Sequence, residues 1–114
     1  MRLSKNQILA ILKAKEKIFP NSQIYLFGSR TDNTRAGGDI DLYILSDNRV
    51  LDGVKKRIEF LVLLKSLIGD QKIDVILATQ SQNRLIDKIV KKEGILIQAS
   101  DEPTAQTRSK LTAT

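Results

Sequence analysis

Cysteine and histidine are both absent from the 114 residues of this chain. Their absence excludes a disulfide framework, a zinc site built from cysteine and histidine, a thiolate nucleophile and a serine–histidine pair. Any catalysis must therefore use carboxylates, lysines, hydroxyls or a metal ion held by oxygen ligands. A length of 114 residues also favours one domain over two independent cores.

Long apolar runs and aromatic residues are scarce as well. The longest uninterrupted apolar run is residues 60–64, far short of the roughly 20 residues that a membrane span needs. Lysines interrupt the N-terminal segment, so we expect no signal peptide and, with no cysteine to oxidise, a cytoplasmic protein. The three phenylalanines and two tyrosines argue against a stacking platform for single-stranded nucleic acid.

Positive charge is in excess, with a net charge of +6 and a pI near 9.7. This charge favours an anionic partner, but it does not distinguish nucleic acid, nucleotide and acidic protein. The positive residues are scattered along the chain, so binding of nucleic acid is the least favoured of these. Residues 100–114 have no periodic apolar face, and we expect a mobile tail there, which leaves residues 1–99 as the domain.

Helical and strand patterns alternate along residues 1–99. Ser4 and Gln7 form a capping-box pattern before a helix over residues 5–19, which Pro20 ends. Strands are predicted over residues 24–27, 39–45, 72–78 and 95–97. A second helix is predicted over residues 49–68, with its N-cap among residues 46–48, and a third ends near Gly94. This order predicts an α/β domain, a small sheet of three to four strands flanked by helices.

Two of these helices carry an apolar pattern at helical spacing. The stripe of the second helix is made of Leu51, Val54, Ile58, Leu61, Leu64 and Ile68. One apolar face of the third helix is made of Leu85, Ile86, Ile89 and Val90. The directions of the strands do not follow from these patterns.

Three aspartates are expected on one face of neighbouring strands. Alternation in the strand over residues 39–45 puts Asp39 and Asp41 on the same face, about 6–7 Å apart, and Asp74 interrupts another strand. At an effective dielectric of about 20, each such pair repels by roughly 2–3 kcal/mol. Side-chain packing alone does not explain why carboxylates that repel each other would be placed so close together. A divalent cation, Mg²⁺ or Mn²⁺, offsets it and leaves positions for water and phosphate.

The loop after the first strand adds the chemistry of phosphate binding. A lone Asp-x-Asp pair is more often ordinary, because each aspartate could cap a strand or face solvent at an edge. Gly28 and Ser29 change the balance, since glycine permits close backbone approach and a hydroxyl with loop N–H groups can hold phosphate oxygens. Arg30 in the same loop could neutralise phosphate charge.

The combined pattern is F-G-S, nine residues, D-I-D-L and, some thirty residues further on, K-I-D-V-I. It resembles the minimal nucleotidyltransferases of the DNA polymerase β superfamily. The resemblance implies the polymerase β-like fold with a small mixed sheet. It also implies two Mg²⁺ ions, with nucleotide phosphates at Gly28, Ser29 and Arg30, and metal ligands and catalytic carboxylates at Asp39, Asp41 and Asp74. Asp74 is implied to orient or deprotonate the attacking hydroxyl.

The same resemblance implies a function. Such enzymes move a nucleoside monophosphate, here expected to be AMP from ATP, to an acceptor. The chain is similar to the antitoxins of toxin–antitoxin pairs whose toxin is a helical HEPN ribonuclease. This implies a hetero-oligomer in which the chain modifies a hydroxyl of its partner and silences it. Two alternatives stay open: a catalytically weak module that neutralises its partner by contact, and a basic nucleic-acid-binding domain.

Overall fold

The expected alternation of helices and strands is present in the computed structural model, which describes residues 3–28, 39–47 and 49–98. The elements are α1 (Lys5–Ile18), β1 (Ser22–Phe27), β2 (Ile40–Ser46), α2 (Gly53–Ile68), β3 (Ile73–Thr79), α3 (Leu85–Glu93) and β4 (Ile95–Ile97). The predicted α/β class is therefore confirmed. Ser29, Arg30 and the expected tail over residues 100–114 lie outside the described residues.

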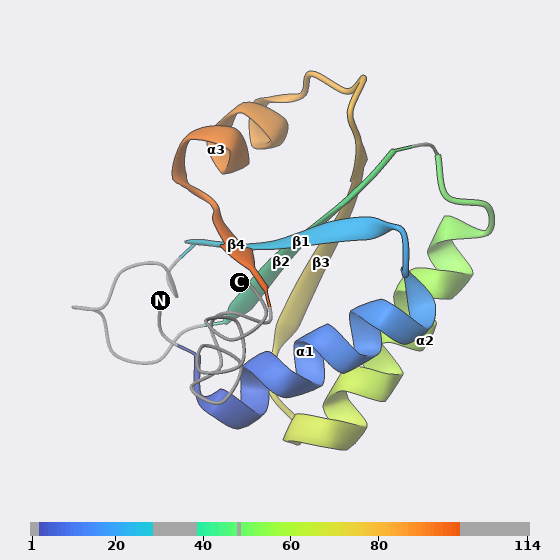
Figure 1. The fold of residues 1–114 in the computed structure, drawn as a ribbon, viewed down its shortest axis with the longest axis vertical. Coiled ribbons are helices and arrows are strands. Elements are labelled where there is room, and N and C mark those ends of the chain that lie inside the picture. Colours follow the sequence, from blue (N-terminus) through green and yellow to red (C-terminus); the bar gives the residue numbers. More distant parts are fainter. Residues whose placement is uncertain (1–2, 29–38, 48, 99–114) are drawn as a thin grey trace, which may run out of the picture.

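The sheet is mixed, with the strand order β3-β2-β1-β4. β2 and β3 run parallel, and α2 is the crossover between them. β1 is antiparallel to both of its neighbours, β2 and β4. Figure 1 shows α1 and α2 side by side on one face of this sheet and α3 on the other face.

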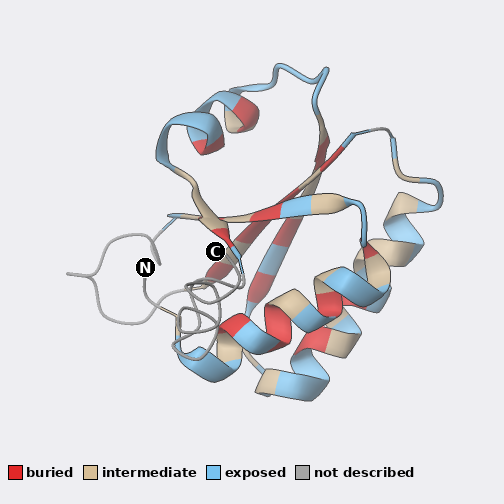
Figure 2. Cartoon of the chain, viewed as in Figure 1, coloured by how far each residue is buried: buried red, intermediate tan, exposed pale blue. Residues whose placement is uncertain are grey.

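Alternation along β2 divides its side chains between two apolar clusters. Ile40, Leu42 and Ile44 are fully buried in the larger cluster, which lies beneath α1 and α2. Tyr43 points to the opposite face, where it packs with Val90 of α3. Buried residues therefore follow each other along the centre of the sheet in Figure 2. The alternation expected from the sequence is confirmed, and the residues on the odd-numbered face of β2 lie on the α3 side.

The helix α1 begins where its capping pattern predicts. Ser4 Oγ accepts a hydrogen bond from the Gln7 backbone N–H at 3.1 Å, and Gln7 Oε1 accepts one from the Ser4 N–H at 2.8 Å. These two bonds satisfy backbone donors that a helix start leaves without partners. The helix ends at Ile18, and Phe19 turns into the core against Phe60 of α2, with 5.8 Å between the ring centroids.

The prediction for α2 was wrong in its start. The helix begins at Gly53, four residues later than expected, and none of residues 46–48 is its N-cap. β2 continues through Ser46, which pairs with Ser22 and Thr79, so this residue is held in the sheet. The chain then turns at Asp52, whose φ of 55° is left-handed and which makes no side-chain capping bond.

The apolar stripe predicted for α2 was wrong for its first three residues. Leu64 is buried as expected, but its buried companion is Phe60, and Leu61 and Ile68 are only partly buried. Leu51, Val54 and Ile58 are exposed to solvent. The pattern on α3 is similar, since Val90 is buried while Leu85 and Ile89 are exposed. No helix among the described residues has the length and apolar character that crossing a lipid bilayer requires.

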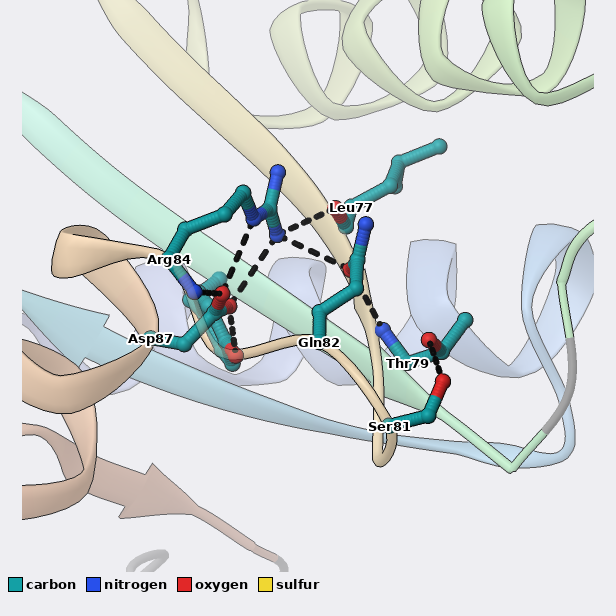
Figure 3. A network of polar contacts seen from close by, with 7 residues as sticks. Leu77, Thr79, Ser81, Gln82, Arg84 and Asp87 are labelled. Carbon is teal, nitrogen blue, oxygen red and sulfur yellow. Dashed lines mark hydrogen bonds and ion pairs between the residues drawn. The ribbon is translucent and has the colours of Figure 1, made fainter.

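A buried acid holds α3 onto the sheet. The Asp87 carboxylate accepts hydrogen bonds from the Tyr43 hydroxyl at 2.6 Å and from the Arg84 backbone N–H at 2.7 Å. Arg84 Nε and Nη2 also donate to it at 2.9 and 3.0 Å, and Nη2 reaches the Leu77 carbonyl oxygen at 3.2 Å (Figure 3). Arg84 chiefly lowers the pKa of Asp87, to about 2, and burial together with the bond to Asp87 raises that of Tyr43 to about 12.

We expect Asp87→Ala to lower the free energy of unfolding by about 2 kcal/mol, because the tyrosine hydroxyl and the guanidinium lose their shared acceptor. The pKa of Asp87 is lower in the folded state, so its contribution is present above the ordinary pKa of an aspartate and is lost as the pH falls toward about 2. Urea unfolding of both proteins at pH 7 and near pH 2 measures this. A difference that stays equal at the two pH values would contradict the assignment.

Candidate active site

The register of the parallel strands places two of the predicted aspartates beside each other. Asp41 of β2 stands directly opposite Asp74 of β3, and Phe27 of β1 is its partner on the other side. One step earlier, the Ile40 N–H donates to the Lys72 carbonyl oxygen at 3.1 Å, which fixes that register. By alternation, Asp41 and Asp74 lie on the α3 side of the sheet, at the end of the strands away from the Asp87 network.

The surroundings of Asp41 disfavour the ionised form of its carboxyl group. Its pKa is raised, first by partial burial and then by the negative charges of Asp74 and Asp39. A side-chain hydrogen bond with Asp74 raises it further, and the positive charge of Lys72 acts in the opposite direction. Two neighbouring carboxyl groups resist ionising together. A cation between them would remove that resistance.

Asp39 reaches the same cluster through an ion pair. Its Oδ2 lies 3.6 Å from Nζ of Lys72, and the two side chains are 43% and 73% exposed. Pairs this exposed contribute about 0–1 kcal/mol to stability, so a competing cation could displace Lys72 at low cost. Asp39 is therefore near enough to influence Asp41 but is not locked into the fold.

Gly28 lies against the Asp41 carboxylate. Its φ is +77°, a conformation that side chains with a Cβ rarely adopt. A Cβ built at this position would overlap Asp41 Oδ2 and would stand 3.2 Å from Asp41 Cγ. The glycine thus brings a backbone turn directly beside Asp41, and the phosphate contact expected of Gly28 stays a prediction. The adjoining Ser29 and Arg30 are outside the described residues.

Lys72 is the residue at this site that the sequence analysis did not single out. It precedes Asp74 by two residues, so strand alternation places both on one face. That alternation was a usable signal. The structure thus places Asp41 beside Asp74 at the start of the parallel strand pair, with Gly28 against Asp41 and with Asp39 paired to Lys72.

The carboxylate oxygens of this site fit Mg²⁺ when a substrate supplies the remaining ligands. Across the described ranges 3–28, 39–47 and 49–98, no three acidic side chains are grouped closely enough to hold a metal ion by themselves. Asp41 and Asp74 supply hard carboxylate oxygens whose mutual repulsion a cation relieves. Mg²⁺ is commonly bound by one or two carboxylates together with substrate phosphates. The residues therefore fit a cation that is completed by a nucleotide, and not a closed protein cage.

Comparisons with known proteins agree with the polymerase β-like architecture. A family model described as "Polymerase beta, Nucleotidyltransferase" matches residues 6–102. A solved toxin–antitoxin with AMP-PNP is 23% identical, with a TM-score of 0.60, over 97% of this chain and 87% of that one. A mutant of the toxin–antitoxin MntA-HpeT is 22% identical, with a TM-score of 0.58, over 97% and 87%. At these identities the two structures establish a shared fold. No curated protein matches the chain.

Proposed function

This chain belongs to the polymerase beta nucleotidyltransferase family, and from that premise we propose that it transfers AMP from ATP to a hydroxyl group of a partner protein. The observation that carries the proposal is the placement of Asp41 directly opposite Asp74 on neighbouring strands, with Gly28 against the Asp41 carboxylate. Side-chain packing does not explain why two carboxyl groups stand next to each other in a partly buried position, where the pKa of Asp41 is raised. A site that receives a cation with a triphosphate does account for them.

The proposed partner is a helical HEPN toxin, which the chain would modify and silence as its antitoxin in the cytoplasm. Support comes from the two structural neighbours, which are toxin–antitoxin proteins and share the fold over 97% of this chain. One of them was solved with AMP-PNP, an analogue of ATP. The described residues form one sheet with three helices, and the proposal needs an acceptor hydroxyl beside it. A hydroxyl supplied by another chain meets that need.

Each residue of the site has a role in this proposal. Asp39 and Asp41 would hold Mg²⁺ against the phosphates, and Asp74 completes the set from the neighbouring strand. Bound Mg²⁺, two ions in the proposal, with Mn²⁺ as a substitute, supplies charge neutralisation at the triphosphate and a lowered pKa at the acceptor hydroxyl. Gly28, with Ser29 and Arg30 of the following loop, would bind phosphate oxygens through backbone N–H groups, a hydroxyl and a guanidinium.

The proposed reaction forms one bond to phosphorus and breaks another. The acceptor oxygen attacks the α-phosphorus of ATP in line, and the bond from that phosphorus to the bridging oxygen breaks. Pyrophosphate leaves with the electron pair of that bond, and AMP stays on the acceptor. Asp74 accepts the hydroxyl proton, because its carboxylate stands next to Asp41 and the chain has no histidine to do so.

Labelled ATP tests the proposal directly. The full chain is incubated with a purified HEPN-type toxin, Mg²⁺ and ATP labelled on the α-phosphate. We expect label on the toxin, and a parallel loss of its ribonuclease activity. Label transfer that is absent while the toxin is still silenced would contradict the enzyme and would favour neutralisation by contact.

A further inference from the structure

Lys72 lies just before β3, beside the carboxylate pair. The parallel register extends to this residue, since the Ile40 N–H donates to the Lys72 carbonyl oxygen at 3.1 Å. Asp39 and Lys72 are therefore neighbours across the two strands, one step before Asp41 and Asp74 face each other. Alternation places all four side chains on the α3 side of the sheet. They form a group of three acids with one base at its corner.

The Lys72 ammonium offsets part of the negative charge of this group. Its Nζ lies 3.6 Å from Asp39 Oδ2. The same positive charge acts on Asp41, where it lowers the pKa against the opposite effects of burial, Asp74 and Asp39. One ammonium cannot balance three carboxylates, so the group stays negative when all of its members are ionised. Lys72 thus stands where a divalent cation would offset the repulsion more completely.

The position of the Lys72 side chain is weakly held. It is 73% exposed, and the Asp39 side chain with which it pairs is itself 43% exposed. Such a pair gains little free energy, because water screens both charges and because ordering a long side chain costs conformational entropy. Lysine also carries its charge on a flexible four-carbon stem. The ammonium can therefore leave Asp39 while the strand that carries it stays in place.

The other ion pair on this sheet face is built differently. Arg84 binds the carboxylate of Asp87 through Nε and Nη2, at 2.9 and 3.0 Å, and the Asp87 side chain is only 8% exposed. Two guanidinium bonds to one buried carboxylate fix both partners, which suits a permanent anchor. Lys72 instead offers a single point charge at 3.6 Å, in solvent. This contrast favours a role for Lys72 other than holding the fold together.

We propose that Lys72 changes partner during binding: it pairs with Asp39 while no divalent cation is bound, and with the α-phosphate of the nucleotide once cation and nucleotide are bound. The inference rests on the proposed transferase function. Lys72 is repelled from Asp39 by a cation held there, and is attracted by the negative charge that a triphosphate brings to the same face. The reacting phosphate must lie between the turn at Gly28 and the carboxylate of Asp74. Lys72 stands on the Asp74 side of that position, where its ammonium can donate to a phosphate oxygen.

Two titrations of the full chain test this exchange of partners in the variant Lys72→Met. Mn²⁺ is first added without nucleotide, and the free ion is followed by electron paramagnetic resonance. We expect the variant to bind Mn²⁺ at least about threefold more tightly, because no ammonium competes for Asp39. The analogue α,β-methylene ATP, which cannot release pyrophosphate, is then added at saturating Mn²⁺ in a calorimeter. We expect the variant to bind it about tenfold more weakly, because a charged contact to phosphate is lost.

Two further variants serve as controls. Lys55→Met removes the same charge from an exposed lysine of α2, the helix that covers the sheet face opposite to the carboxylate pair. It should bind Mn²⁺ and the analogue as the unaltered chain does. Lys72→Arg keeps the positive charge and should bind the analogue within about threefold of the unaltered chain. Circular dichroism confirms that each variant is folded.

The two titrations distinguish failure of this inference from failure of the proposed function. If the unaltered chain bound neither Mn²⁺ nor the analogue, the proposed function would be overturned, and the role of Lys72 with it. If the unaltered chain bound both and Lys72→Met changed neither affinity, the exchange would be wrong and the function would stand. Tighter Mn²⁺ binding with unchanged affinity for the analogue would exclude the phosphate contact. Weaker binding of both would assign Lys72 to the fold.

Discussion

Asp41→Asn should reduce AMP transfer by a factor on the order of 10³ or more. Asparagine keeps the size of the side chain but removes the negative charge that holds the cation against the triphosphate. Asp74 stands opposite Asp41 and supplies the second carboxylate of the pair. We therefore expect Asp74→Asn to reduce the rate of AMP transfer by a similar factor. Initial rates with labelled ATP and the partner protein measure both effects. Asp47→Asn, at an exposed position just beyond the other end of β2, is the matched control and should keep full activity.

The stability of Asp41→Asn separates loss of chemistry from loss of fold. The pKa of Asp41 is raised in the folded chain, so the favourable contribution of its protonated form is present at low pH and is lost as the pH rises through that raised pKa. At neutral pH the ionised group opposes folding, and asparagine removes this opposition. After allowance for solvent screening we expect Tm to rise by roughly 1–4 °C. A variant that is inactive but less stable would show that Asp41 serves the fold.

Strand alternation explains how much of this site could be predicted from the sequence. The pattern over residues 39–45 fixes which face carries Asp39 and Asp41, because a strand has a period of two. It does not fix the neighbour of that strand. The contact with Asp74 depends on β2 and β3 being parallel and in a particular register, and α2 establishes both by carrying the chain across the sheet. The sequence could therefore predict which carboxylates form the cluster but not that Asp41 stands directly opposite Asp74.

The misassigned face of α2 has a different cause. Residues 60–64 are all apolar, so hydropathy permits more than one side of the helix to face the core. Contacts distant in sequence decide between them, since Phe60 packs against Phe19 and turns Leu64 inward with it. Val54 and Ile58 are then left outside. Residues that the pattern assigns to the core are in this case exposed to solvent.

The two polar clusters of the α3 face have opposite electrostatics. At one end of the sheet, Asp87 has a guanidinium and a hydroxyl as partners, and its pKa is lowered. At the other end, partial burial and then the neighbouring carboxylates raise the pKa of Asp41. The first arrangement stabilises the ionised acid and anchors α3. The second leaves an unfavourable negative charge that a bound cation would relieve. The residues that stabilise the fold and the residues proposed to act in catalysis therefore lie at opposite ends of one sheet face.

Gly28→Ala should lower AMP transfer by about 10²-fold or more, because displacing a reacting group by about 1 Å costs that much. The new Cβ would overlap Asp41 Oδ2, so the carboxylate or the turn must move. The fold should also lose about 1–2 kcal/mol, since alanine is strained at a φ of +77°. Transfer rates and urea unfolding of the same preparations measure the two effects.

Gly69→Ala separates strain from contact. Gly69 has a φ of +95°, but nothing lies within 4 Å of a Cβ built there. It ends α2, which covers the sheet face opposite to the carboxylate pair, so alanine should cause a similar loss of stability with nearly full transfer activity. If both variants lost activity equally, instability would be the cause. If Gly28→Ala were as active as Gly69→Ala, the close approach of this turn to Asp41 would have no part in the reaction.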